Sequence, residues 1–176
     1  MDAILLTAPD GSIYSANPAA TRMFGRSEDE IKQIGRNGLV DISDPRLKPA
    51  LAERGEKGSF FGELSFFRKD GTKFPAEVST SLFLDNEQNL RTTMIIRDIT
   101  ERKRNEQLLA TEKTVLEMIS TGVSLDLILE KIVLNIEVLS PGTIASILLL
   151  DFDGLHIHYG AAPHLPDDYN KAIEGA

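Results

Sequence analysis

The fold of this chain is decided by residues 93–101, which read TMIIRDITE. Residues 93–97 are largely apolar or β-branched, and the run has the length of a strand rather than of a buried helix. Thr100 is a favoured N-cap residue, and Glu101 places negative charge in the first helical turn, where the helix dipole favours it. A strand is therefore expected to pass directly into a helix at this point.

The helix after this junction is expected to cover residues 101–123 as a signalling helix or coiled-coil linker. Leu109, Leu116 and Val123 recur every seven residues, as one core position of a coiled coil does. The other core position is mostly polar, and only Ile119 is apolar there. Such a short and partly polar seam predicts a marginal pairing helix.

The residues before the junction, 1–100, predict one small α+β domain. Residues 3–15 have the pattern of a hairpin around an Asp-Gly turn, and residues 17–58 that of three short helices bounded by caps and glycines. Asp44-Pro45 is expected to open the third helix. Residues 60–97 predict three more strands, the first two joined by a second Asp-Gly turn. The expected architecture is a five-stranded antiparallel sheet with short helices on one face.

Residues 124–176 predict the start of a second region. An amphipathic helix is expected after Ser124, followed by an apolar strand over residues 143–152, a third Asp-Gly turn, a partner strand and a short helix over residues 165–174. A single hairpin on a helix has little core to stabilise it. We interpret this region as an incomplete α/β segment of a longer protein.

Composition and charge exclude several classes of function. The net charge is −8, and residues 101–176 contribute most of it, with 6 basic against 12 acidic side chains. An acidic chain without a basic stripe is a poor partner for nucleic acid or anionic lipid. The chain lacks cysteine, which excludes disulfides, thiolate metal sites and cysteine-linked pigments within it. No secretory leader and no apolar run of about 20 residues occur, so we expect a cytoplasmic location and no membrane contact by this segment.

The motif search gives no support for catalysis. The sequence contains no phosphate-binding glycine loop, no Gly-x-Ser-x-Gly elbow, no Cys/His metal spacing and no Gly-Gly-Asp-Glu-Phe cyclase signature. The helix over residues 101–123 contains no histidine that could accept a phosphoryl group. We therefore expect no enzyme activity from this chain. A catalytic subunit is the rival interpretation from another class.

Several motifs of the first region resemble the PAS family of sensor domains. Residues 17–25, with Asn-Pro-Ala-Ala and Met-Phe-Gly, are similar to the first PAS helix, and residues 62–75 are similar to the central PAS hairpin. The exit over residues 97–103 resembles the strand-to-helix motif, often called the PAC motif, on which PAS domains end. The resemblance implies a module that binds a small molecule in a helix-lined cleft, or that only dimerises.

The second region resembles the beginning of a GAF domain. The resemblance is carried by residues 146–151 and 160–163, in the order that GAF domains show. It implies a fragment of a bacterial- or archaeal-type multidomain signalling protein, with a PAS domain at residues 1–100, a linker at 101–123 and a partial GAF domain at 124–176.

The candidate site residues follow from this assignment. The expected PAS cleft is lined by Met23, Leu47, Leu51, Leu64, Phe66, Val78, Leu82, Met94 and Ile96. Their apolar character is equally explained by folding alone. The expected signal relay is formed by Arg97, Asp98, Ile99, Thr100, Leu109, Leu116, Ile119 and Val123.

The histidines bear on the cofactor. His156, His158 and His164 all lie in the second region, so the PAS region offers no histidine for haem, and cysteine is absent for a covalent bilin. His156 and His158 share one face of a strand, but a third metal ligand is not apparent, so we predict no metal site. The sequence leaves open whether the chain binds a non-covalent small molecule or no cofactor at all.

The function expected from these observations is a sensory module of a signal-transduction protein, of the sensor histidine kinase or cyclic-di-GMP enzyme type. A ligand or the dimer state would be detected by the PAS domain and relayed through the helix to a downstream output domain. A homodimer through the PAS domain and the linker helix is expected. The alternatives are a ligand-free dimerisation scaffold and a non-covalent flavin-type redox sensor.

Overall fold

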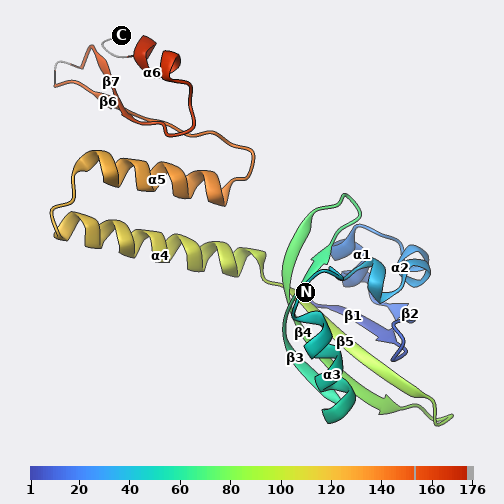
Figure 1. Cartoon of the computed structure of the whole chain (residues 1–176). Coiled ribbons are helices and arrows are strands. Elements are labelled where there is room, and N and C mark those ends of the chain that lie inside the picture. The colour runs from blue at the N-terminus through green and yellow to red at the C-terminus, as the bar shows by residue number, and fades with distance from the viewer. Residues whose placement is uncertain (153, 174–176) are drawn as a thin grey trace. The chain divides into compact units, whose positions relative to one another are not determined.

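The structure is a computed structural model that describes residues 1–152 and 154–173 (Figure 1). The chain divides into two compact units, Met1–Arg102 and Lys103–Ala176. Each unit is described by itself below.

The first unit is built on a five-stranded antiparallel sheet, as the sequence predicts. Its strands are β1 (Ala3–Thr7), β2 (Ile13–Ala16), β3 (Ser59–Phe67), β4 (Lys73–Leu84) and β5 (Leu90–Asp98). They are arranged in the order β2-β1-β5-β4-β3, so the two terminal segments of the unit pair at its centre. The three strands β3, β4 and β5 follow one another as a meander joined by tight turns.

Short helices connect β2 to β3 and contribute to the same core as the sheet. They are α1 (Pro18–Phe24), α2 (Glu28–Ile34), the 3-10 helix η1 (Arg36–Gly38) and α3 (Leu47–Lys57). Asn17 caps α1 by accepting from the Ala20 amide, and Ser27 forms a capping box at the start of α2, as their residue types predict. The third helix begins at Leu47 rather than at Asp44-Pro45, because the Asp44 carboxylate accepts from the Arg46 amide in a turn ahead of the helix.

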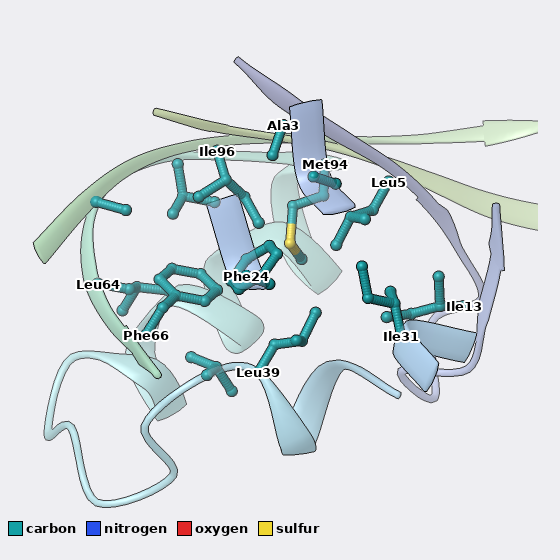
Figure 2. Close-up of a cluster of buried hydrophobic side chains, with 14 of the residues drawn as sticks. Ala3, Leu5, Ile13, Phe24, Ile31, Leu39, Leu64, Phe66, Met94 and Ile96 are labelled. Carbon is teal, nitrogen blue, oxygen red and sulfur yellow. The ribbon is translucent and has the colours of Figure 1, made fainter. Parts of the chain in front are cut away.

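The core of the first unit lies between these helices and one face of the sheet (Figure 2). Phe24 from α1, Phe66 from β3 and Phe74 from β4 are fully buried, and their ring centroids lie 5.9 to 6.0 Å apart in tilted pairs. Leu5 and Ile96 continue this core across β1 and β5. Tilted aromatic pairs at this distance add stability beyond the area that they bury.

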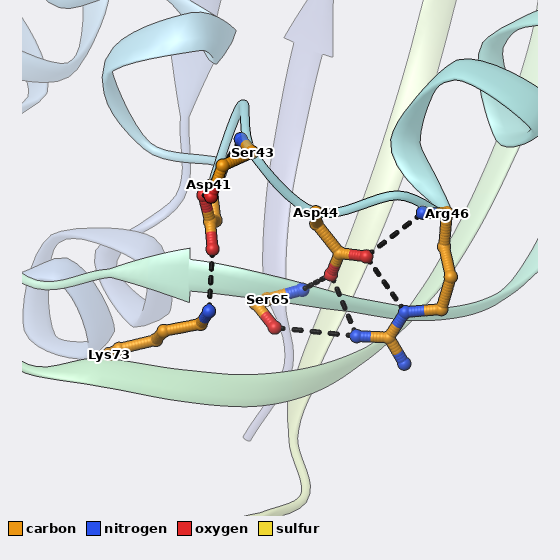
Figure 3. Close-up of polar contacts among 6 residues, drawn as sticks. All are labelled: Asp41, Ser43, Asp44, Arg46, Ser65 and Lys73. Atoms are coloured by element: carbon orange, nitrogen blue, oxygen red, sulfur yellow. Dashed lines mark hydrogen bonds and ion pairs between the residues drawn. The ribbon is translucent and has the colours of Figure 1, made fainter.

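A buried carboxylate attaches the start of α3 to the sheet (Figure 3). Asp44 accepts from the Ser65 amide at 2.9 Å and from Arg46 Nε and Nη2 at 2.9 and 2.7 Å. Lys73 pairs with Asp41 at 2.6 Å beside it. The hydrogen bonds from Arg46, together with those from backbone amides, lower the pKa of Asp44 well below its usual range despite burial.

The second unit holds most of a long helix, a second helix and a two-stranded sheet. Its elements are α4 (Thr100–Ser120), whose first turn lies in the first unit, α5 (Leu125–Leu139), β6 (Ile147–Leu150), β7 (Ile157–Ala161) and α6 (Asp167–Ile173). The strands pair antiparallel, and α5 packs against β7. The predicted third Asp-Gly turn includes Asp153, and the predicted last helix includes Glu174; both residues lie outside the described part of the chain.

The Asp44 contacts predict a specific stability change. Asp44→Ala leaves the buried Ser65 amide without its acceptor, so the free energy of unfolding should fall by about 1–3 kcal/mol. Asp44→Asn keeps one acceptor and should cost less. Urea unfolding followed by circular dichroism measures both, with the exposed Asp29→Ala as the control.

The same contact predicts a dependence on pH. Because the folded-state pKa of Asp44 lies below the value of 3.8 that an aspartate has in the unfolded chain, its contribution is present above that pH and is lost as pH falls toward the folded-state pKa. The stability difference between the wild type and Asp44→Ala should shrink below about pH 4. A difference that stays constant down to pH 2 would contradict the assignment.

Candidate functional site

A cavity lies between α3 and the sheet of the first unit. Twelve residues line it: Arg36, Val40, Leu47, Ala50, Leu51, Arg54, Phe60, Leu64, Phe66, Val78, Thr80 and Met94. The space among them measures about 330 Å³ with its open side included, although only a small part is wide enough for a water molecule. Leu51 and Phe60 are the two lining residues that are partly exposed.

The structure brings six of the nine predicted cleft residues to this cavity. They are Leu47, Leu51, Leu64, Phe66, Val78 and Met94. Ligand binding by these six residues stays a prediction.

The other three predicted cleft residues lie elsewhere in the first unit. Ile96 is fully buried in the core but does not line the cavity. Met23 borders a surface hollow beside Arg68, and Leu82 lies half-buried on β4 beyond Thr80. Alternation along a strand identifies its inward face, whereas the crossing of α3 decides which part of that face borders the cavity.

Two buried arginines at the cavity were not predicted from the sequence. Arg36 and Arg54 are 8% and 6% exposed, and Arg36 Nη1 and Arg54 Nη2 both donate to the Pro9 carbonyl, at 3.5 and 3.2 Å. Arg54 follows Leu47 by seven residues and therefore lies on the apolar face of α3, a periodic signal that could have identified it. No comparable signal marks Arg36.

Burial lowers the pKa of both arginines, yet they stay cations. Desolvation is the main cause for each, and the nearby Arg36 charge lowers the pKa of Arg54 further. A guanidinium titrates so far above neutral pH that such shifts do not discharge it. The surface that the cavity exposes is apolar, and the head groups of the two arginines are directed to the turn at Pro9 and Asp10.

The junction of β5 and α4 is held by Asp98. Its Oδ1 accepts from the Thr100 amide at 2.8 Å, and its Oδ2 pairs with Arg68. Burial would raise the pKa of Asp98, but hydrogen bonds from Thr100 and Arg68 outweigh it and lower the pKa. From the sequence we expected Thr100 to supply the side-chain acceptor that caps the helix. The Asp98 carboxylate supplies it instead. The Thr100 hydroxyl is buried without a hydrogen-bond partner among the described residues.

Arg68 extends this junction into the rest of the first unit. Its guanidinium lies 4.1 Å from the centroid of the Phe74 ring and donates to the Met23 carbonyl at the end of α1. Arg68 was not predicted as a functional residue, because its position before the Asp-Gly turn gives no signal for this role. The buried Ile99 follows Asp98 and donates its amide to the Pro75 carbonyl.

The outer face of the sheet carries a second set of charges near the junction. Arg97 pairs with Asp2 at 2.6 Å, and Arg102 of α4 pairs with Glu63 at 3.1 Å and Glu77 at 3.3 Å. Glu63 and Glu77 lie directly opposite each other on β3 and β4, so Arg102 offsets a like-charge pair. These contacts join the first turn of α4 to two strands.

The predicted relay residues on α4 face solvent in the single chain. Leu109, Leu116 and Ile119 are 64%, 59% and 58% exposed, and no described residue of α4 is buried. Val123 lies beyond the end of the helix and is half-buried.

Within the described part of the chain, histidine and carboxylate side chains do not gather in groups of three that could hold a metal ion. His158 lies 3.1 Å from Asp151, and His164 lies 2.5 Å from Glu137. None of the helices over residues 1–152 and 154–173 combines the length and the apolar content that a bilayer span requires.

Comparison with known proteins identifies relatives of the first unit. A family model described as PAS domain matches residues 1–101. The crystal structure of a PAS domain from Colwellia psychrerythraea has a TM-score of 0.51 and 25% identity, and the match covers 57% of this chain and 87% of that one.

Two curated relatives are much longer proteins. The methyl sulfide methyltransferase-associated sensor of Methanosarcina acetivorans is 43% identical over 81 residues, which is 46% of this chain and 8% of that protein. The sensor histidine kinase TmoS of Ectopseudomonas mendocina is 31% identical over 112 residues, which is 60% of this chain and 11% of that protein. The match therefore spans about a tenth of the length of each.

The junction predicts the effect of a single substitution. Asp98→Ala removes the acceptor of the Thr100 amide and leaves the half-buried Arg68 without its carboxylate, so stability should fall by about 1–3 kcal/mol. Amide hydrogen exchange should become faster in the first turn of α4. The exposed Asp70→Ala serves as the control, and unchanged exchange at residues 100–102 would contradict the role of Asp98.

Proposed function

The chain belongs to the PAS domain family, and we propose that it is a sensory module that passes a signal from its PAS domain to other domains of a longer protein. PAS domain family membership rests on the match over residues 1–101. The relatives carry the printed names of a sensor and a sensor histidine kinase. These names support a sensory role. The proposal places an output domain of the histidine kinase or cyclic-di-GMP enzyme type elsewhere in the parent protein, and the chain in the cytoplasm.

One observation carries the mechanism: the same strand borders the cavity and holds the helix. Met94 and Asp98 are four residues apart on β5, so their side chains project from the same face about 13 Å apart. Met94 lines the cavity, and Asp98 accepts the Thr100 amide at the start of α4. A ligand that displaces Met94 would shift β5 and thereby bias the direction in which α4 leaves the sheet.

The relay beyond the sheet requires a second copy of the chain. Leu109, Leu116 and Ile119 are exposed in the single chain and spaced as coiled-coil core positions, which supports pairing of α4 in a homodimer. The outer face of the sheet supports the same dimer, since Ile4, Ile95 and Phe61 lie in one row across it and are exposed. The pairing is expected to be marginal, because the seam is short and partly polar. Marginal pairing suits a relay, since a bistable element is what a ligand can bias.

The parts of the module are assigned as follows. Residues 1–100 form the PAS domain, residues 101–123 the signalling helix, and residues 124–176 the beginning of a GAF domain. The helix–hairpin–helix order of α5, β6, β7 and α6 supports the last assignment. The relay residues are Arg97 to Thr100 at the junction and Leu109, Leu116, Ile119 and Val123 along the helix.

A charge in the seam tests the dimeric relay. Leu116→Glu should convert a dimer into a folded monomer, because burying the two introduced carboxylates without partners would cost several kcal/mol per pair. Light scattering measures the mass, and circular dichroism measures the helix content. Gln107→Glu places the same charge at an exposed polar position of α4 and should keep the dimer. A Leu116→Glu protein that remains dimeric, or a wild type that is monomeric, would contradict the relay.

The sensory role predicts a bound or bindable small molecule. Native mass spectrometry of the purified wild-type chain, followed by denaturing analysis of the released fraction, should detect a co-purified small molecule at partial or full occupancy. A Val78→Trp variant fills the cavity and should lose this molecule. Identical small-molecule content in the two proteins would favour the ligand-free scaffold.

A further inference from the structure

A row of charged side chains crosses the outer face of the sheet where α4 begins. Glu63 of β3 lies directly opposite Glu77 of β4, and Glu77 lies directly opposite Arg97 of β5. The antiparallel register of β1 with β5 places Asp2, the residue before β1, opposite Arg97. The row therefore reaches from the segment ahead of β1 to β3 at the edge of the sheet.

Arg102 from the first turn of α4 contacts this row at the carboxylates of β3 and β4. Its guanidinium lies 3.1 Å from Glu63 and 3.3 Å from Glu77. At the other end of the row, Arg97 Nε and Nη2 donate to the two carboxylate oxygens of Asp2 at 3.0 and 2.6 Å. The charges alternate along the row: Asp2, Arg97, Glu77, Arg102 and Glu63. Ion pairs thus link the residue before β1 to the first turn of α4.

Glu77 is shared unequally between the two arginines. Arg97 Nη1 lies 3.9 Å from the Glu77 carboxylate, close to the outer limit of an ion pair, whereas Arg102 lies 3.3 Å from it. The Glu77 side chain is 23% exposed, the smallest value in the row, so solvent screens its charge least. Arg97 stays away from Glu77 because its planar head group is engaged with Asp2 in a bidentate pair.

Loss of the Asp2 carboxylate would change the partner of Arg97. Glu77 lies directly opposite Arg97, at the cross-strand spacing at which opposite charges attract. A closer Arg97–Glu77 pair would bring two guanidinium groups to one carboxylate. Because these groups repel each other, the attraction between Glu77 and Arg102 would weaken. The register of the sheet thus offers Arg97 two alternative partners, Asp2 and Glu77.

We propose that the segment ahead of β1 controls how firmly α4 is held, through an exchange of partners at Arg97. While Arg97 pairs with Asp2, Glu77 is available to Arg102, and the first turn of α4 stays on β3 and β4. When Asp2 is withdrawn, Arg97 pairs with Glu77 and the first turn of α4 is released. These are the two discrete arrangements that a switch requires.

This input is separate from the ligand-driven relay proposed above. The residues that line the cavity include no member of the charged row, and the row lies on the opposite face of the sheet from the core. Displacement of the segment ahead of β1 would therefore act on α4 without any change in the cavity.

Hydrogen exchange measured by NMR on the whole chain tests the exchange of partners. In an α-helix that begins at Thr100, the amides of residues 104–107 donate to the carbonyls of residues 100–103, so their exchange rates report on the first turn of α4. Asp2→Ala should accelerate exchange at these amides about two- to fivefold, as the weakening of a partly exposed ion pair predicts. Asp29→Ala removes an exposed carboxylate of α2 and should leave the rates unchanged.

A double variant separates the exchange of partners from a purely structural role of Asp2. In Asp2→Ala/Arg97→Gln the second change removes the cation that competes for Glu77, so exchange at residues 104–107 should return close to the wild-type rate. If the ion pairs only add independent stability, the double variant should exchange at least as fast as Asp2→Ala. That result would overturn the proposal, and so would wild-type rates in Asp2→Ala alone.

The proposed sensory role and this inference fail in different measurements. If Asp2→Ala leaves exchange unchanged while Asp98→Ala accelerates it, the junction of β5 and α4 keeps its role and control from the segment ahead of β1 is wrong. If the double variant restores the wild-type rate but Leu116→Glu remains dimeric, the exchange of partners at Arg97 is correct and the dimeric relay is wrong.

Discussion

The carboxylate of Asp98 has two partners, and the passage from β5 into α4 depends on both contacts. One oxygen accepts the Thr100 amide at the start of α4, and the other pairs with Arg68. Arg68 also lies over the Phe74 ring and donates to the Met23 carbonyl. A half-buried ion pair adds only modest stability. Its effect is on geometry, since it joins the end of β5, the β3–β4 hairpin, the end of α1 and the first turn of α4.

The cavity lies between two firmly held parts of the first unit. The Asp44 contacts hold the start of α3 on β3, and the three phenylalanines close-pack the neighbouring core. Between these two regions the cavity exposes only apolar atoms, although Arg36, Arg54 and Thr80 are among its lining residues.

The second unit is stabilised differently from the first. Among its described residues, Ile128, Val133, Ala161 and Ala162 are buried, whereas large apolar side chains on α4 and α5 are exposed. A two-stranded sheet with so small a core gains little from burial. The exposed apolar surface of the helices is suited to contacts with further protein, which agrees with a role as a connecting part of the module.

The sequence by itself determined the features that depend on a few neighbouring residues. The alternating strands, the caps at Asn17 and Ser27 and the passage from strand to helix near Thr100 follow from periodicity and local hydrogen bonding. These features, together with the motifs at the exit, were sufficient to predict the five-stranded antiparallel sheet and the PAS fold. The apolar pattern along α3, β3, β4 and β5 also identified six residues that line the cavity.

Only the tertiary structure decided which side chains meet. The guanidinium groups of Arg36 and Arg54 converge on one carbonyl of a distant turn, and Asp98 takes the capping position expected of Thr100 because Arg68 holds it there. Met23 and Leu82 have the right character for the cavity but lie away from the crossing of α3. These arrangements arise from contacts between segments that are tens of residues apart in the sequence. Local periodicity carries no information on such contacts.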